Sequence, residues 1–193
     1  MARLREFDYD KTLVSAGKQF WANGYQATSI KDIASVTGVK PGSLYKAFGD
    51  KKGLFLKCVK HYMEQSSYYA ILIENPDAPF KESLRKIFKL MVDSCDESVR
   101  NSGCLVTNAA YEMASVDEEI FGEMNKHLSQ MKQAVLNRIR LAQESGEIDS
   151  EKDADSLAAY IMTLIQGLLV SSKVTKDQSE MRKAIQLGLD ILG

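Results

Sequence analysis

Apolar residues recur at the spacing of an α-helix along nearly the whole chain, and proline hardly interrupts them. Only 3 of the 193 residues are prolines. Because proline lacks a backbone donor and breaks the interior of a helix, this scarcity favours long helices over a loop-rich β fold. A half-buried strand requires apolar and polar residues to alternate, and no stretch of useful length shows this alternation. The sequence therefore predicts an all-α protein, with a length that suits one or two compact domains.

Glycines, prolines and helix-capping residues mark the breaks between the expected helices. The segment 74–80 holds two of the three prolines and is expected to be a linker. Helices are expected at 8–23, 29–37, 41–48 and 51–73 before the linker, and near 80–98, 104–114, 117–145, 153–173 and 178–192 after it.

The formal net charge of −1 conceals a strong asymmetry along the chain. Residues 1–60 carry 11 Lys and Arg against 5 Asp and Glu, whereas residues 61–193 carry 14 against 21. A basic N-terminal part suits contact with nucleic acid, but chance clustering on solvated faces explains the charges equally well. The charge distribution alone therefore leaves both interpretations open.

The segment Ile30–Phe48, IKDIASVTGVKPGSLYKAF, has the pattern of two short helices joined by a tight turn. In a helix-turn-helix the two helices cross steeply, which requires a small residue where they touch and a glycine in the turn. Ala34 and Gly38 meet these two requirements, and the spacing alone fits an ordinary helical hairpin about as well. The apolar residues expected to hold the crossing are Ile33, Val39 and Leu44.

The outward face of the second of these helices favours the DNA-binding interpretation. With Leu44 and Phe48 facing inward, the opposite face holds no acidic residue. Side chains there suit both base edges in a major groove and phosphate oxygens. Further phosphate contacts are expected near helix starts, where backbone N–H groups are free. Each lysine alone would be an ordinary solvated charge, but several converging donors predict a DNA site made of Thr28, Lys40, Pro41, Gly42, Ser43, Tyr45, Lys46, Lys51 and Lys52.

The segment Phe20–Phe55, FWANGYQATSIKDIASVTGVKPGSLYKAFGDKKGLF, resembles the DNA-binding signature of the TetR family of bacterial transcriptional regulators. The family pattern has a Gly-Tyr pair, then Asp-Ile-Ala, Gly-Val and Tyr-x-x-Phe, followed by a lysine-rich helix start. The sequence matches this pattern throughout. Ala47 stands where the family often has histidine, a departure that bears on one phosphate contact and not on the fold.

The resemblance implies a homodimeric transcriptional regulator, most simply a repressor that a small-molecule effector releases from double-stranded operator DNA. It implies a three-helix DNA-binding domain at residues 1–50 and a helical effector-binding and dimerisation domain at 51–193, with 51–73 as a connecting helix. A twofold dimer places its two recognition helices on half-sites about one helical turn apart, ~34–36 Å or a multiple of this.

The resemblance also implies that the last two helices form the dimer interface as a four-helix bundle. Both helices carry wide apolar stripes, and Gly167 would permit close approach. The alternative is that these stripes pack only inside their own subunit. The residues expected at the interface are Leu157, Ile161, Leu164, Ile165, Leu168, Met181, Ile185 and Leu189.

An effector pocket is expected in the second domain, where 7 of the 8 methionines lie. Flexible thioethers suit adaptable pockets, although core gap-filling is the commoner role of any single methionine. A small apolar or aromatic effector fits such a lining. The expected lining residues are Phe88, Met91, Val92, Cys104, Asn108, Met113, Phe121, Met124 and Met162.

Cys104 supports an alternative trigger for DNA release. It follows Gly103 at the expected start of a helix, and a helix N-terminus favours a reactive thiolate. This Gly-Cys pair resembles a subgroup of the family that senses oxidants or electrophiles through thiols. A small residue capping a pocket is the structural alternative. The odd count of 3 cysteines argues against a disulfide framework.

Other classes of function are less well supported. A helical enzyme using Cys104 and His127 lacks a complete catalytic constellation, and Cys58 with His61 supplies too few ligands for a metal site. We expect no catalytic residue, metal or cofactor. A non-specific architectural DNA binder would need more positive charge. No apolar run approaches the roughly 18 residues of a membrane span, and the N-terminus does not look like a signal peptide, so we expect a cytoplasmic protein without a membrane partner.

Overall fold

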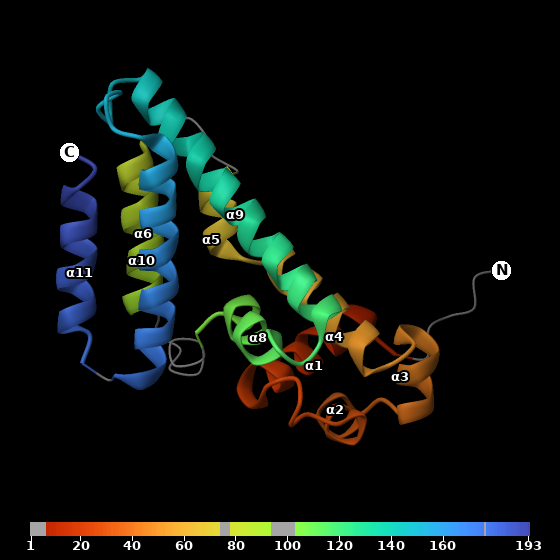
Figure 1. Ribbon diagram of the computed structural model, residues 1–193. Coiled ribbons are helices and arrows are strands. Elements are labelled where there is room, and N and C mark those ends of the chain that lie inside the picture. The colour runs from red at the N-terminus through yellow and green to blue at the C-terminus, as the bar shows by residue number, and fades with distance from the viewer. Residues whose placement is uncertain (1–6, 74–77, 94–102, 176) are drawn as a thin grey trace. The chain divides into compact units, whose positions relative to one another are not determined.

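The computed structural model describes residues 7–73, 78–93, 103–175 and 177–193, and over these ranges the regular structure is helical throughout (Figure 1). The predicted all-α class is confirmed. The helices are α1 (Tyr9–Asn23), α2 (Ile30–Thr37), α3 (Pro41–Phe48), α4 (Lys51–Glu64), α5 (Ser67–Ile73), α6 (Phe80–Asp93), α8 (Leu105–Met113), α9 (Glu118–Glu144), α10 (Ala154–Val174) and α11 (Ser179–Asp190).

Aspartate caps explain why several helices begin where they do. Asp8, Asp50 and Asp153 each accept a hydrogen bond from the backbone N–H three residues further on, at 3.0, 2.7 and 2.8 Å. Such a cap satisfies one of the N–H groups that the first helical turn leaves without a partner. The starts of α1, α4 and α10 are therefore set by local sequence, and they lie within two residues of the predicted positions.

The helix expected at 51–73 is in fact two helices. α4 ends at Glu64, where the N–H of Gln65 bonds to the carbonyl of His61, and α5 begins at Ser67. Gln65 is followed by two serines, whose hydroxyl groups compete with the helix for backbone hydrogen bonds. Of the expected linker 74–80, residues 74–77 lie outside the described residues, as do residues 94–98 of the helix expected at 80–98.

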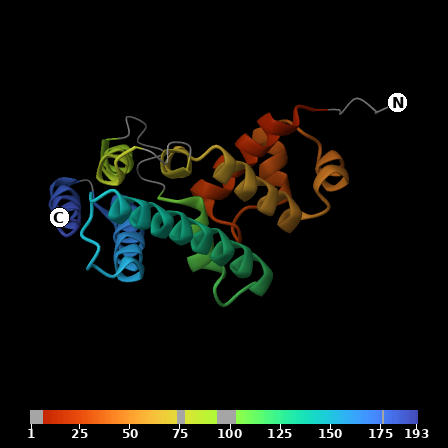
Figure 2. The same ribbon diagram turned by 90° about the horizontal axis from the view of Figure 1, so that it is seen from above.

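The chain divides into two compact units. The first comprises residues 1–65 and 104–125, and the second comprises 66–103 and 126–193. The long helix α9 runs from one into the other without a break (Figure 2). This division by packing differs from the predicted functional boundary after residue 50, because α4 packs on α1 and so belongs to the first unit. The contact includes Phe55 of α4, whose ring lies edge-on to that of Phe20 with 5.0 Å between the ring centroids. A functional division at residue 50 stays a prediction.

In the first unit, the N-terminal helices bury one side each, and Ile33, Leu44 and Phe48 are buried as the sequence predicted. Leu13, Ala16 and Phe20 of α1 are buried, as is Ile33 of α2. The buried residues contributed by α3 and α4 are Leu44, Phe48, Leu54, Phe55, Cys58 and Val59. This core fixes which faces of α2 and α3 remain in solvent.

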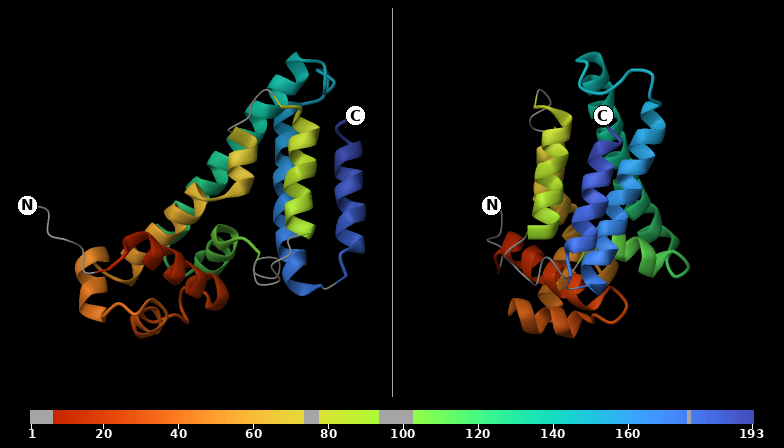
Figure 3. Two further views of the ribbon diagram at one scale, coloured as in Figure 1. Left: turned by 180° about the vertical axis from the view of Figure 1, so that it is seen from behind. Right: turned by 90° about the vertical axis from the view of Figure 1, so that its left-hand side faces the viewer.

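In the second unit, α6, α10 and α11 run side by side (Figure 3). Their facing side chains form one apolar core that includes Leu84 and Phe88 of α6, Ile161 of α10 and Leu189 of α11. Among the described residues, α10 alone is long and apolar enough to cross a membrane by length and composition. The prediction that no segment approaches that length is therefore too strict, although a core helix of a soluble protein passes the same test.

Candidate nucleic-acid interface

The start of α2 is fixed by a reciprocal capping arrangement. The hydroxyl of Ser29 accepts a hydrogen bond from the N–H of Asp32 at 3.2 Å, and the Asp32 carboxylate accepts one from the N–H of Ser29 at 2.8 Å. The Ser29 hydroxyl also donates to this carboxylate at 2.6 Å. The bonds from the Ser29 side chain and backbone hold the pKa of Asp32 below its ordinary value. Ser29 is thus the cap residue of α2.

The turn between α2 and α3 has the tight geometry that the sequence predicted. Gly38 adopts a left-handed conformation with φ +70° and ψ 5°, and its N–H bonds to the carbonyl of Ala34 at 2.9 Å. Val39 is buried, and Pro41 stands at the first position of α3, where its missing donor costs nothing. Two short helices joined by such a turn are a helix-turn-helix.

The side of α3 predicted to read DNA faces solvent. Leu44 and Phe48 are buried in the first unit, so the opposite side is presented outward. Tyr45 has 50% of its surface exposed, and Ser43 is half-buried. The remaining predicted residues of this side are also exposed: Lys40, Pro41, Gly42 and Lys46.

Thr28 takes part in the scaffold and not in the exposed surface. Its side chain is 1% exposed, and its hydroxyl donates to the carbonyl of Gly24 at 2.7 Å. The hydroxyl is therefore engaged inside the loop of residues 24–29, which we call the α1–α2 loop.

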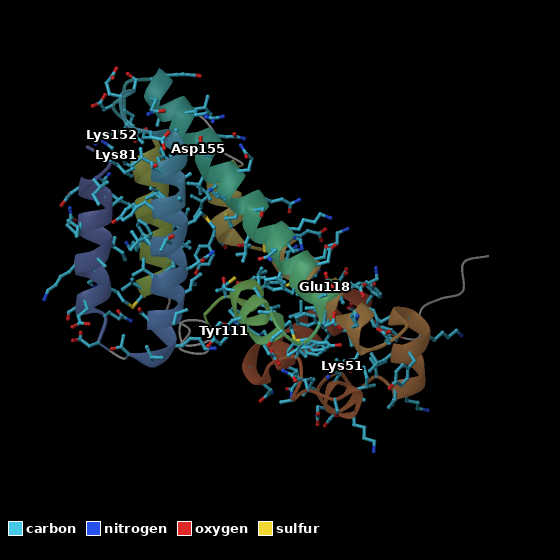
Figure 4. The ribbon with its side chains drawn as sticks, in the orientation of Figure 1. Lys51, Lys81, Tyr111, Glu118, Lys152 and Asp155 are labelled. Atoms are coloured by element: carbon cyan, nitrogen blue, oxygen red, sulfur yellow. The ribbon has the colours of Figure 1, made fainter. Side chains whose placement is uncertain are left out.

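The two lysines at the start of α4 have protein partners. The Lys51 ammonium lies 4.3 Å from the ring centroid of Tyr25 and 3.4 Å from the carbonyl oxygen of Gln26 (Lys51 is labelled in Figure 4). The Lys52 ammonium lies 2.8 Å from Glu119 Oε2 and 2.9 Å from Asp117 Oδ2. Bonds to Glu119 and then Asp117 raise the pKa of Lys52. Both lysines remain predicted phosphate ligands.

Sequence reasoning missed three acidic residues that pack against this region. Asp117 and Glu119 pair with Lys52 of α4, and the Glu112 carboxylate accepts hydrogen bonds from the N–H groups of Tyr25 and Gln26 at 2.9 and 2.7 Å. These partners are 65 to 87 positions apart in the chain. Since local pattern carries no information on such pairings, no sequence signal could have identified them.

The predicted effector-pocket residues fall in both units. Phe88, Met91 and Val92 of α6 and Met162 of α10 are buried together in the apolar core of the second unit. Those in the first unit are Cys104, Asn108, Met113, Phe121 and Met124. Their joint role as a pocket stays a prediction.

The second unit contains a cavity of about 430 Å³, which is lined by residues other than those predicted for the effector pocket. Buried Arg138 donates to the carbonyl of Ala78 and to the hydroxyl of Ser83, and Glu147 accepts hydrogen bonds from the N–H groups of Phe80 and Lys81, both at 2.8 Å. These contacts tie the start of α6 to α9 and the turn that follows it. The cavity is lined by Ala78, Pro79, Phe80, Arg138, Leu141, Ala142, Ser145 and Glu147 and contains none of the predicted pocket residues.

The apolar stripes predicted for the dimer interface are largely used within the protomer. Leu157, Ile161, Leu168, Met181 and Leu189 are buried in the core that α10 and α11 share with α6, and Leu164, Ile165 and Ile185 pack partly against it. The reason is that α6 supplies a third helix to cover this side. The same two helices leave other apolar side chains in solvent: Val170 at 54%, Val174 at 80%, Leu187 at 63% and Ile191 at 39% exposure.

The cysteines and histidines in the described part of the chain form no metal site. There, no three His, Cys, Asp or Glu side chains gather so as to hold a metal ion. Cys58 is 2% exposed, and burial raises the pKa of its thiol to about 12. Cys104 is half-buried at the N-cap of α8. Cys58 is thus an inert core residue, and Cys104 is the more accessible thiol of the two.

The chain matches known families along most of its length. Residues 13–58 match the family described as bacterial regulatory proteins, tetR family, and residues 81–187 match the tetracyclin repressor-like C-terminal domain. It is 31% identical over 195 residues to the uncharacterized HTH-type transcriptional regulator YezE of Bacillus subtilis, covering all of both chains. It is 24% identical to the HTH-type transcriptional repressor ComR of Escherichia coli, covering 96% of this chain and 87% of ComR.

Solved structures share the fold over the full length. A cysteine mutant of the TetR family transcriptional regulator CifR, complexed with a 26 bp double-strand operator DNA, superposes with a TM-score of 0.87 at 26% identity, covering 99% of this chain and 100% of that one. The reduced form of Escherichia coli NemR superposes with a TM-score of 0.83, covering 95% and 96% of the two chains, and at 14% identity it bears on the fold alone.

Proposed function

The chain belongs to the TetR family of bacterial transcriptional regulators, and from this premise we propose that it is a homodimeric repressor which a small apolar or aromatic molecule releases from operator DNA. Its family is one of regulators and not of enzymes. Because such a regulator works where the chromosome lies, we also propose a cytoplasmic location.

The exposed side of α3 supports the DNA-binding part of the proposal. Buried Leu44 and Phe48 hold the helix so that its basic, acid-free side faces outward. With α3 in a major groove, Ser43 and Lys46 reach base edges, and Lys40 and Tyr45 contact phosphates. CifR, which shares the fold, is described in a complex with double-strand operator DNA. This outward side is the single observation that carries the function.

A second copy of the chain would supply the other half-site. The exposed apolar residues of α10 and α11 can bury one another across a twofold axis. Gly167 of α10 is exposed, and a side chain added there would meet nothing within 4 Å in its own protomer, so a partner helix can approach closely. We propose an interface centred on Gly167, Val170, Val174, Leu187 and Ile191.

Release by an effector requires that effector and operator favour different conformations of the dimer. Their coupling is reciprocal, so bound operator must weaken effector binding by the same factor as the effector weakens operator binding. An apolar effector fits the methionine-rich interior predicted from the sequence, although the lining itself is a proposal.

Genome-wide footprinting of the protein in its source cells tests the function. The proposal predicts a small set of pseudo-palindromic sites whose half-sites are one or two helical turns apart, upstream of genes whose transcripts rise when the regulator is deleted. The neighbouring genes then indicate the effector. Diffuse occupancy without a shared sequence would contradict a sequence-specific regulator, and falling transcripts would identify an activator.

Oxidation of Cys104 is a second candidate trigger. The thiol is half-buried at the start of α8, and its side chain makes no capping hydrogen bond. A hydroperoxide would oxidise the thiol to a sulfenic acid and be reduced to the alcohol. In a DNA-release assay with cumene hydroperoxide, Cys104→Ser should remain bound to operator while wild type and the control Cys58→Ser dissociate. Equal release from Cys104→Ser and wild type would reject this trigger.

A further inference from the structure

The end of α8 and the start of α9 join the DNA-binding helices at two polar contacts inside the first unit. The carboxylate of Glu112, near the end of α8, holds the α1–α2 loop through two backbone N–H groups. A few residues later, Asp117 and Glu119 hold Lys52 at the start of α4. Residues of α8 and of the start of α9 therefore contact the segments on either side of the helix-turn-helix directly.

Glu112 contacts the α1–α2 loop through both oxygens of its carboxylate. Oε2 accepts from the N–H of Tyr25 and Oε1 from that of Gln26, so both carboxylate oxygens are used. A Cβ atom added to Gly24 would lie 3.0 Å from Oε2, so the loop backbone lies directly against the carboxylate. Charged acceptors form the stronger class of backbone hydrogen bond.

The same loop is also held by the ring of Tyr25, which packs against two other aromatic rings. Tyr25 lies 5.0 Å from Phe55 and 6.0 Å from Phe20, measured between ring centroids, and burial raises the pKa of its hydroxyl. The loop is thus fixed between an apolar cluster and a carboxylate. It leads directly into Ser29, the cap of α2, so its position sets where α2 begins.

We propose that Glu112 is a positioning residue for operator binding, because its carboxylate fixes the α1–α2 loop and thereby the placement of α2 and α3. The conformation of α8 is then linked to the affinity for DNA, and bound DNA must stabilise the Glu112 contact in return. The DNA part of this inference rests on the proposed function.

Simple electrostatics predicts the opposite effect of removing this carboxylate. A negative charge in a DNA-binding unit repels phosphates, so its neutralisation should strengthen binding. A positioning role predicts that neutralisation weakens binding, while the salt dependence keeps its slope because no phosphate contact is lost. The sign of the affinity change therefore separates the two explanations.

Fluorescence anisotropy of the full-length protein on a footprinted operator provides the test. Glu112→Gln and Glu112→Ala should weaken binding at least tenfold, with an unchanged slope of log affinity against log salt. Glu118→Gln, an exposed carboxylate at the start of α9 (Figure 4), is the matched control and should bind like wild type. Wild-type or tighter binding by both Glu112 variants would overturn the inference.

Amide hydrogen exchange of the free protein tests the loop without DNA. The amides of Tyr25 and Gln26 should exchange at least tenfold faster in Glu112→Gln than in wild type or Glu118→Gln, with unchanged exchange in α10 showing that the variant is folded. Unchanged loop exchange would also overturn the inference. If wild type binds no operator, the proposed function fails, and the exchange result still decides the role of Glu112 in the loop.

Discussion

The ammonium group of Lys52 lies 2.9 Å from Oδ2 of Asp117, a residue 65 positions further along the chain. Oδ1 of the same carboxylate accepts hydrogen bonds from the N–H groups of Glu119 and Ile120, both at 3.1 Å, and so caps α9. The Asp117 side chain therefore caps α9 and also pairs with Lys52, a predicted phosphate ligand. If Lys52 binds operator phosphates, as predicted, those phosphates would have to compete with Asp117 and Glu119.

Removing one of these competitors should strengthen operator binding. Glu119→Gln retains the shape of the side chain but loses the ionic partner of Lys52, so we expect an affinity about twofold to fivefold higher, the range typical of an exposed ion pair. The slope of log affinity against log salt should steepen by up to about 0.9, as for one added phosphate contact. Anisotropy titrations at several salt concentrations measure both, and a slope equal to that of Glu118→Gln would show that Lys52 does not reach DNA.

Two glycines near the helix-turn-helix should differ in their tolerance of alanine. Gly38 has a left-handed backbone with open space around it, so Gly38→Ala should destabilise the fold by about 1 kcal/mol. Gly24 has φ +83° and ψ 166°, a region used almost only by glycine, and its added Cβ would press on Glu112. Gly24→Ala should therefore cost more than about 2 kcal/mol in urea unfolding. Equal losses for the two variants would contradict the close contact at Glu112.

A charge on the exposed apolar surface of α11 should separate the dimer. Leu187 is 63% exposed in the protomer, so Leu187→Glu should leave the fold intact and yield a monomer in sedimentation at micromolar concentration. Val14→Glu, at a 44% exposed apolar position on α1, is the control and should stay dimeric. A dimeric Leu187→Glu would place the interface elsewhere, and a monomeric wild type would reject the proposed geometry.

The stability of the protein should fall in acid because aspartates accept hydrogen bonds at the starts of its helices. Hydrogen bonds from Ser156 lower the pKa of Asp153 below its ordinary value of 3.8, and those from Ser29 and Ser179 do the same for Asp32 and Asp177. A lowered folded-state pKa gives stability that is present above the ordinary value and lost as the pH falls through the folded value. Melting temperatures should therefore be nearly constant from pH 5.5 to 7 and drop below about pH 4.

A single-residue comparison isolates the contribution of one cap. Asp153→Ala should melt below wild type at pH 7, and the difference should shrink as the pH falls below 3.8 toward the lowered folded-state pKa of Asp153. Asp10→Ala, at an exposed position in the first turn of α1, should shift the melting temperature less at pH 7. A difference between Asp153→Ala and wild type that is constant with pH would show that the charge of Asp153 contributes nothing.

Features that depend on neighbours in the chain were predictable, and those that depend on distant partners were not. Gly38 and Pro41 mark the turn and the start of α3 through their backbone properties alone, so the two short helices and their turn followed from spacing. Their DNA-binding role was favoured by the outward face of α3 and by the family resemblance. Glu112 is 87 positions from Tyr25, and its local pattern is that of any charged helical residue. Likewise, an apolar stripe such as that of Leu157 and Ile161 looks the same whether its own subunit or a partner covers it, and here α6 covers it.

The most direct test is a competition measurement of operator binding by the wild-type protein and by a Tyr45→Ala, Lys46→Ala double variant. Wild type should bind a footprinted operator at least 10³-fold more tightly than a scrambled duplex at physiological salt. The double variant should lose nearly all of this preference, while Lys57→Ala, an exposed lysine of α4, should retain it. Equal preference for the operator in wild type and the double variant would contradict the claim that α3 reads the DNA.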